Sequence, residues 1–64
     1  MREVEVQPVY TNDGSYKKIV TIYGTSGESK PTAGLAFGSC FIEVDTGKAY
    51  LFNETTSAWV EQGA

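Results

Sequence analysis

The stretch FIEVDTGKAYLF, residues 41–52, contains two apolar segments separated by the triplet Asp45-Thr46-Gly47. The triplet is typical of a tight turn: Asp can accept nearby backbone N–H groups, and Gly tolerates the left-handed region because it has no Cβ. A type I turn over residues 44–47 would then close a three-residue hairpin with a bulge. This register pairs Val44 with Lys48, Ile42 with Tyr50 and Cys40 with Phe52, and it makes one face nearly all apolar.

The same triplet is also the form in which aspartic proteases present a catalytic carboxylate, so a second interpretation competes. That chemistry needs two carboxylates sharing a proton, and the chain holds one copy of the triplet. Lys48 follows the glycine and would place a cation beside the dyad of a homodimer. We therefore interpret Asp45, Thr46 and Gly47 as a structural turn and predict no protease activity.

Working outward from this hairpin, period-two alternation and turn residues predict further strands. Pro8 cannot donate to a sheet ladder, so the first strand should lie at an edge or end at that point, and Asn12-Asp13-Gly14 is a turn signal before the second, central strand. The predicted strands cover residues 4–10, 16–24, 39–44, 49–53 and 58–62. We expect an all-β antiparallel meander of about five strands, with a regular C-terminal three-stranded sheet and little or no helix.

Residues 24–38, GTSGESKPTAGLAFG, show no helical or strand periodicity and predict a long loop. Leu35, Ala36 and Phe37 interrupt its polarity. They either tuck under the sheet, which we favour, or form an apolar contact site for a partner.

The composition limits both stability and chemistry. A chain of 64 residues forms one small domain, residues 1–64, and a single cysteine excludes a disulfide within the chain. Without histidine, neither a serine nor a cysteine nucleophile has its usual base, and one thiol builds no zinc site. We expect no enzyme activity, no metal and no cofactor, and we expect the small core to be completed by another chain, in a homo-oligomer or with a different protein.

The net charge of −3 disfavours direct binding to nucleic acid, because phosphates repel an acidic surface. No apolar run approaches the ~20 residues that a membrane span needs, and the N-terminus lacks a signal-peptide core. These features indicate a protein kept in a reducing cytoplasm, without membrane contact.

Aromatic side chains are abundant, with four Tyr, three Phe and one Trp in 64 residues, which is more than a small core needs. We expect some to remain exposed and to bind a protein partner, and we name Tyr23, Phe37 and Trp59 as candidates, with a core position as the alternative for Trp59. Glu43, Glu54 and Glu61 lie in the acidic C-terminal part and would set partner choice.

The C-terminal half resembles a group of small virion-associated proteins of tailed phages, accessory to the head or tail. These carry a Pro-Thr-x-Gly loop, then Gly-Ser-x-Phe-x-x-x-Asp-Thr-Gly-x-x-Tyr-x-Phe, and a Trp about seven residues later. The matching positions are Pro31, Thr32, Gly34, Gly38, Ser39, Phe41, Asp45, Thr46, Gly47, Tyr50, Phe52 and Trp59. The upstream stretch KKIVTIYGTSGESKP, residues 17–31, resembles the same group in its strand and polar loop, so the resemblance covers about the last fifty residues. It implies a structural or accessory role in a phage particle, without catalytic residues.

A second function stays open beside the virion role. A small acidic phage protein can inhibit a host defence protein, such as a CRISPR-associated nuclease whose basic groove accepts carboxylates. A net charge of −3 is weak for such mimicry. Both hypotheses place the protein in the host cytoplasm during infection, and the first also places it in the virion.

Overall fold

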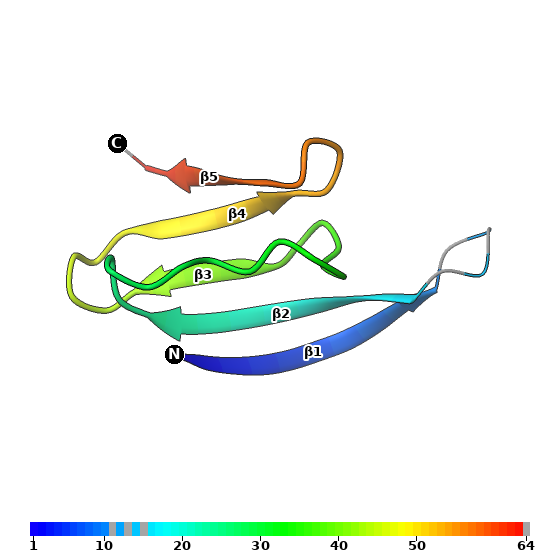
Figure 1. Cartoon of the computed structure of the whole chain (residues 1–64), viewed down its shortest axis with the longest axis horizontal. Coiled ribbons are helices and arrows are strands. Elements are labelled where there is room, and N and C mark those ends of the chain that lie inside the picture. Colours follow the sequence, from blue (N-terminus) through cyan, green and yellow to red (C-terminus); the bar gives the residue numbers. More distant parts are fainter. Residues whose placement is uncertain (11, 13, 15, 64) are drawn as a thin grey trace.

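The computed structural model describes residues 1–10, 12, 14 and 16–63, and its secondary structure is entirely β (Figure 1). The strands are β1 (Arg2–Tyr10), β2 (Tyr16–Gly24), β3 (Cys40–Glu43), β4 (Ala49–Asn53) and β5 (Ala58–Gln62). The prediction of a small all-β fold with five strands is therefore confirmed. The predicted strand bounds agree closely, because Gly, Asp and Asn end each apolar segment.

The five strands form one sheet in the order β1-β2-β3-β4-β5. Three neighbouring pairs are antiparallel, but β2 and β3 run parallel, with Ile22 opposite Phe41. The expectation of a wholly antiparallel meander is wrong at this pair. Parallel neighbours need a crossover connection of a dozen or more residues, and residues 25–39 provide it. We call these residues the covering loop.

The β3–β4 hairpin has a different register from the predicted one. Phe41 pairs with Tyr50 and Cys40 with Leu51. The Glu43 N–H donates to the Lys48 carbonyl, and the Gly47 N–H donates to the Glu43 carbonyl, which closes the loop over residues 44–47. The predicted pairs of Ile42 with Tyr50 and Cys40 with Phe52 are wrong by one residue. Gly47 nonetheless has a φ of 76°, so its left-handed conformation is confirmed. The shift places alternate β3 and β4 residues on the opposite face from the one expected.

The β1–β2 hairpin lies at one edge of the sheet, as Pro8 predicted. Its last pair is Tyr10 with Tyr16, and a register shift between Glu5 and Gln7 marks a bulge that interrupts the edge ladder. Of the predicted turn Asn12-Asp13-Gly14, Asp13 lies outside the described residues. Gly14 has a φ of 84°, which is the conformation that favours glycine in such a turn.

The core lies between the sheet and the covering loop, which crosses in front of β3 in Figure 1. Val20, Ile22, Phe41 and Phe52 are buried on the sheet, and Leu35 of the loop packs with them. Leu35 and Ala36 thus tuck under the sheet as favoured, whereas Phe37 remains 54% exposed. The loop takes the place of a second sheet.

Candidate protein-binding face

The two faces of the sheet have opposite environments because side chains alternate along each strand. In β2, Val20 and Ile22 are fully buried under the covering loop, and Thr21 and Tyr23 point to the other side. The ladder then defines both faces: Ile22, Phe41 and Tyr50 lie side by side on the covered face. On the opposite surface Gly38 of the covering loop lies against the Ile19 side chain, whereas Tyr23, Leu51 and Val60 are each more than 40% exposed, and we call this surface the open face.

The open face is apolar over its central strands. The register aligns Thr21, Cys40, Leu51 and Val60 in one row across the sheet, and Tyr23, Ile42, Ala49 and the polar Gln62 in the next. Leu51 is 43% exposed and Val60 47%, whereas an interior sheet position would be covered. Apart from Lys17, Asn53, Ala58 and Gln62 at the strand ends, the residues of β2 to β5 on the open face are Ile19, Thr21, Tyr23, Cys40, Ile42, Ala49, Leu51 and Val60. Such a contiguous exposed apolar patch marks a surface for association.

Charged side chains are almost confined to the covered face and to the ends of the sheet. Within β2 to β5, Lys17 at the end of β2 is the one charged residue that the strand alternation places on the open face. Its ammonium lies 3.3 Å from Glu54 Oε2. Arg2 of β1 pairs with Tyr23 at the opposite corner. The acidic net charge is therefore carried elsewhere, and the middle of the open face is uncharged.

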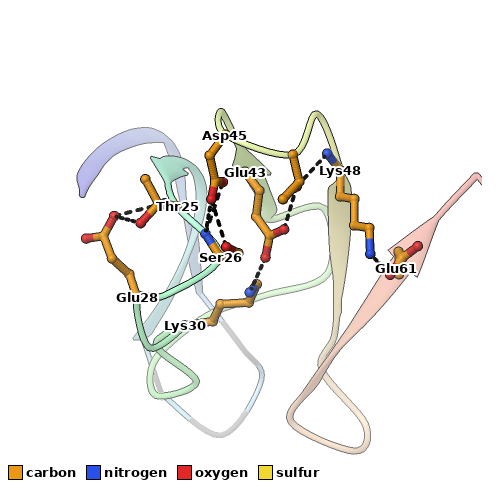
Figure 2. Close-up of polar contacts among 9 residues, drawn as sticks. Thr25, Ser26, Glu28, Lys30, Glu43, Asp45, Lys48 and Glu61 are labelled. Carbon is orange, nitrogen blue, oxygen red and sulfur yellow. Dashed lines mark hydrogen bonds and ion pairs between the residues drawn. The ribbon is translucent and has the colours of Figure 1, made fainter.

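On the covered face, polar contacts hold the covering loop to the β3–β4 hairpin (Figure 2). Ser26 donates to Asp45 through both its backbone N–H and its hydroxyl, the latter at 2.7 Å to Oδ2. Lys30 Nζ lies 2.8 Å from Glu43 Oε2 and within 4.7 Å of the centroids of the Phe41 and Tyr50 rings. The sheet is thereby fixed to its cover.

These contacts shift the acidities of the carboxyl groups. The hydrogen bond from Lys30, and then that from Thr46, lowers the pKa of Glu43 below its ordinary value. The Ser26 hydroxyl does the same to the pKa of Asp45, and the Phe37 backbone N–H lowers the pKa of Glu54. In each case a donor stabilises the charged form. Glu43, Asp45 and Glu54 therefore stabilise the fold through hydrogen bonds within the chain.

Two of the predicted partner-binding residues belong to the interior. The Trp59 ring packs edge-on against Phe52 at 5.1 Å, and its Nε1 donates to the Pro31 carbonyl at 2.8 Å. Trp59 is therefore a core residue, which is the alternative left open for it. Glu43 is only 3% exposed and paired with Lys30, so the expectation that it faces a partner is wrong.

The remaining predicted residues are accessible, but they do not gather in one place. Tyr23 is 45% exposed on the open face, and Phe37 is exposed at the end of the covering loop. Glu54 accepts hydrogen bonds from Phe37 N and from Lys17, while Glu61 on edge strand β5 pairs with Lys48 at 3.7 Å. Only Tyr23 is thus part of the apolar surface that the structure leaves open.

Sequence reasoning missed Ile42, Leu51 and Val60. The signal was present, because β3, β4 and β5 carry apolar residues at both parities: Phe41 and Ile42, Leu51 and Phe52, Trp59 and Val60. A strand that is apolar on both sides is typical of a sheet covered on both faces. Within the described residues, the covering loop packs on one of the two faces.

No family model, curated protein or solved structure matches this chain. Within the described residues there is no pocket and no group of three or more His, Cys, Asp and Glu side chains placed to hold a metal ion. Nor does that part of the chain contain a helix long and apolar enough to cross a membrane. The open face is the most distinctive surface of the described structure.

Proposed function

We propose that this chain is a non-catalytic accessory protein of a tailed-phage particle, which acts by binding a larger virion protein. The proposal combines the motif resemblance of the C-terminal half with the surface chemistry of the folded chain. The proposal assigns no catalysis to the triplet Asp45-Thr46-Gly47, which forms a hairpin loop whose carboxylate accepts hydrogen bonds from Ser26.

The single observation that carries the proposal is the open face. A soluble 64-residue chain that leaves Tyr23, Leu51 and Val60 each more than 40% exposed on one uncharged surface gains stability when another protein covers it. A particle assembled from many subunits offers such cover. The polar network on the opposite side keeps the sheet in shape, so the surface is ready before binding.

The inhibitor hypothesis gains less support from the charges. A mimic of nucleic acid needs a dense array of free carboxylates, whereas Glu3, Glu28, Glu43, Glu54 and Glu61 each lie within 4 Å of an amine of this chain. We therefore retain the virion role as the proposed function.

Particle association is the direct test. A tagged copy would be produced during infection by the phage that encodes the chain, and particles would be separated from free protein on a density gradient. We expect the tagged chain in the particle fraction and a loss of most of it for Leu51→Lys. The matched control is Val44→Lys, which places the same charge on an exposed apolar residue in the β3–β4 loop. A chain found only in the soluble fraction would contradict the proposed function.

A further inference from the structure

We propose that the open face is occupied by a second copy of this chain, which gives a twofold dimer in which two sheets pack face to face. The inference rests on the proposed function in one respect, namely that the open face is a surface for association. It adds the identity of the occupant: the unit that joins the particle is a pair of chains with a two-layer sheet core.

The first argument is that the face is compatible with itself. A twofold axis brings the same surface from both partners together, so any charge at its middle would meet its own copy. The rows Thr21, Cys40, Leu51 and Tyr23, Ile42, Ala49 carry no charge. Arg2 and Lys17 lie at corners of the sheet and stay at the rim of such a pair.

The second argument is the area of the face. The molecule measures 38 × 21 × 17 Å, so its broad side covers at most 800 Å², the product of the two longer dimensions. A standard stable interface hides about 800 Å² on each partner, within a total of roughly 1,200–2,000 Å². A stable dimer would therefore use nearly the whole broad side, including Val4 of β1, which pairs with Thr21 and is 41% exposed, and not only the eight residues of the open face. A smaller contact would leave Tyr23 or Val60 at the opposite ends uncovered.

The third argument is shape. Two twisted sheets pack about 10 Å apart with their strands within about 30° of each other, and side chains of medium size interdigitate between them. The open face offers Ile, Leu, Val, Thr, Ala and Tyr from four adjacent strands. Strands β3, β4 and β5 already carry apolar residues on both faces, as expected for a sheet that is covered on both sides. In the dimer, the covering loop of each chain forms an outer layer, and the two sheets form the two inner layers.

The mass of the purified chain in solution tests the proposal without any particle. In sedimentation equilibrium we expect a species of twice 6.9 kDa that dissociates on dilution. Leu51→Lys should weaken the dimer at least tenfold, because each interface would bury two lysines, while Val44→Lys should leave it unchanged. A wild-type chain that stays monomeric at the highest soluble concentration would overturn the proposal. Trp59 fluorescence reports that each variant is folded, and Thr21→Lys provides a second disruptive change if Leu51→Lys unfolds.

Protection of Cys40 identifies the surface that is used. This thiol is partly exposed in the single chain and lies in the middle strand of the open face. Its alkylation by a maleimide should slow at least tenfold as the wild-type chain is concentrated into the dimer range. A dimer whose Cys40 reacts at an unchanged rate would form through another surface and would contradict the inference.

The two proposals can fail separately. A dimer that never enters particles would refute the virion role and keep the dimer. A monomeric chain found in particles would refute the dimer and keep the virion role.

Discussion

Gly24, the last residue of β2, is required by the packing of one aromatic ring. A Cβ at this position would lie 2.7 Å from Phe41 Cζ, closer than side-chain carbons approach, and Phe41 is fully buried. The absence of a side chain at Gly24 is therefore what leaves room for the Phe41 ring in the core. The glycine ends the strand and also completes the packing.

Gly24→Ala should destabilise the fold by about 1–3 kcal/mol, the usual range for overpacking a core. Urea unfolding followed by Trp59 fluorescence measures this. The control is Gly27→Ala in the covering loop, where a Cβ meets nothing within 4 Å and φ is not positive. We expect that control to unfold within about 0.5 kcal/mol of the wild type. Equal effects at the two positions would show that Phe41 can shift freely.

Gly47 offers the second test at this scale. Its φ of 76° strains a β-branched residue, so Gly47→Val should cost roughly 1 kcal/mol or more of stability. Asp45→Asn should be mild, since the amide oxygen can still accept from Ser26. Thermal unfolding of the two variants compares them, and a peptide-cleaving activity that vanished with Asp45→Asn would revive the protease interpretation.

The covering loop is the element on which the core depends. Leu35 enters the core from it, Pro31 accepts the Trp59 N–H, and Lys30 spans two aromatic rings. Its neighbouring residues Leu35 and Phe37 differ sharply, at 2% and 54% exposure. Leu35→Ala should therefore cost about 2–5 kcal/mol, and Phe37→Ala should stay within about 0.5 kcal/mol. Chemical denaturation of the two variants measures this difference in stability. A larger loss for Phe37→Ala than for Leu35→Ala would show that Phe37 is the buried residue.

Acid should loosen the covering loop. The pKa values of Glu43, Asp45 and Glu54 are all lowered in the folded chain, so the folded state binds fewer protons than the unfolded state near pH 4. Their stabilisation is complete above the unfolded values of about 4 and is lost as the pH falls through the lower folded ones. Midpoints of thermal unfolding should be nearly flat from pH 7 to about 5 and then fall. In Glu43→Gln the midpoint of thermal unfolding should fall less steeply below about pH 5. A chain whose midpoint is the same at all these pH values would contradict the role of the contacts.

Sequence patterns located the strands well because their limits are local. Gly24, Asn53 and the Asp45-Thr46-Gly47 triplet act on their immediate neighbours. The register of the β3–β4 hairpin was wrong because the length of its loop depends on distant partners. Ser26 binds the Asp45 carboxylate, and Lys30 and Thr46 both bind Glu43, which draws that side chain to the covered face. The parallel pair of β2 and β3 likewise follows from contacts of the covering loop, which has no periodicity of its own.

The candidate site was predicted only in part. The excess of aromatic residues correctly indicated exposed apolar surface, and Tyr23 lies on it. Trp59 and Glu43 were assigned by residue type, but an indole and a carboxylate are equally suited to the interior when Pro31 and Lys30 satisfy them. Leu51 was overlooked because the incorrect register placed Tyr50 and Phe52, rather than Leu51, on the apolar face with Cys40 and Ile42, and Val60 pairs with Leu51.

At the scale of the whole molecule, charge and apolar surface are segregated on opposite sides of one sheet. Association through the open face should therefore depend little on NaCl, because it brings no opposite charges together, and should tighten in sulfate, which strengthens apolar burial. Sedimentation at several salt concentrations measures both trends. A dimer that dissociates readily in NaCl would indicate that ion pairs, and a different surface, hold the two chains.

The parallel pairing of β2 with β3 has a consequence for how the chain folds. Strands β1 and β2 can pair through a short local turn, and so can β3, β4 and β5, whereas β2 and β3 meet only after residues 25–39 close on themselves. The chain therefore consists of two local units, β1–β2 and β3–β4–β5, joined by the parallel pairing of β2 with β3. Forming that pairing requires closure of the covering loop, which costs conformational entropy before native contacts can offset it. The transition state should contain that closure. Changes at Leu35 would then slow refolding, while changes within the β4–β5 hairpin would mainly speed unfolding.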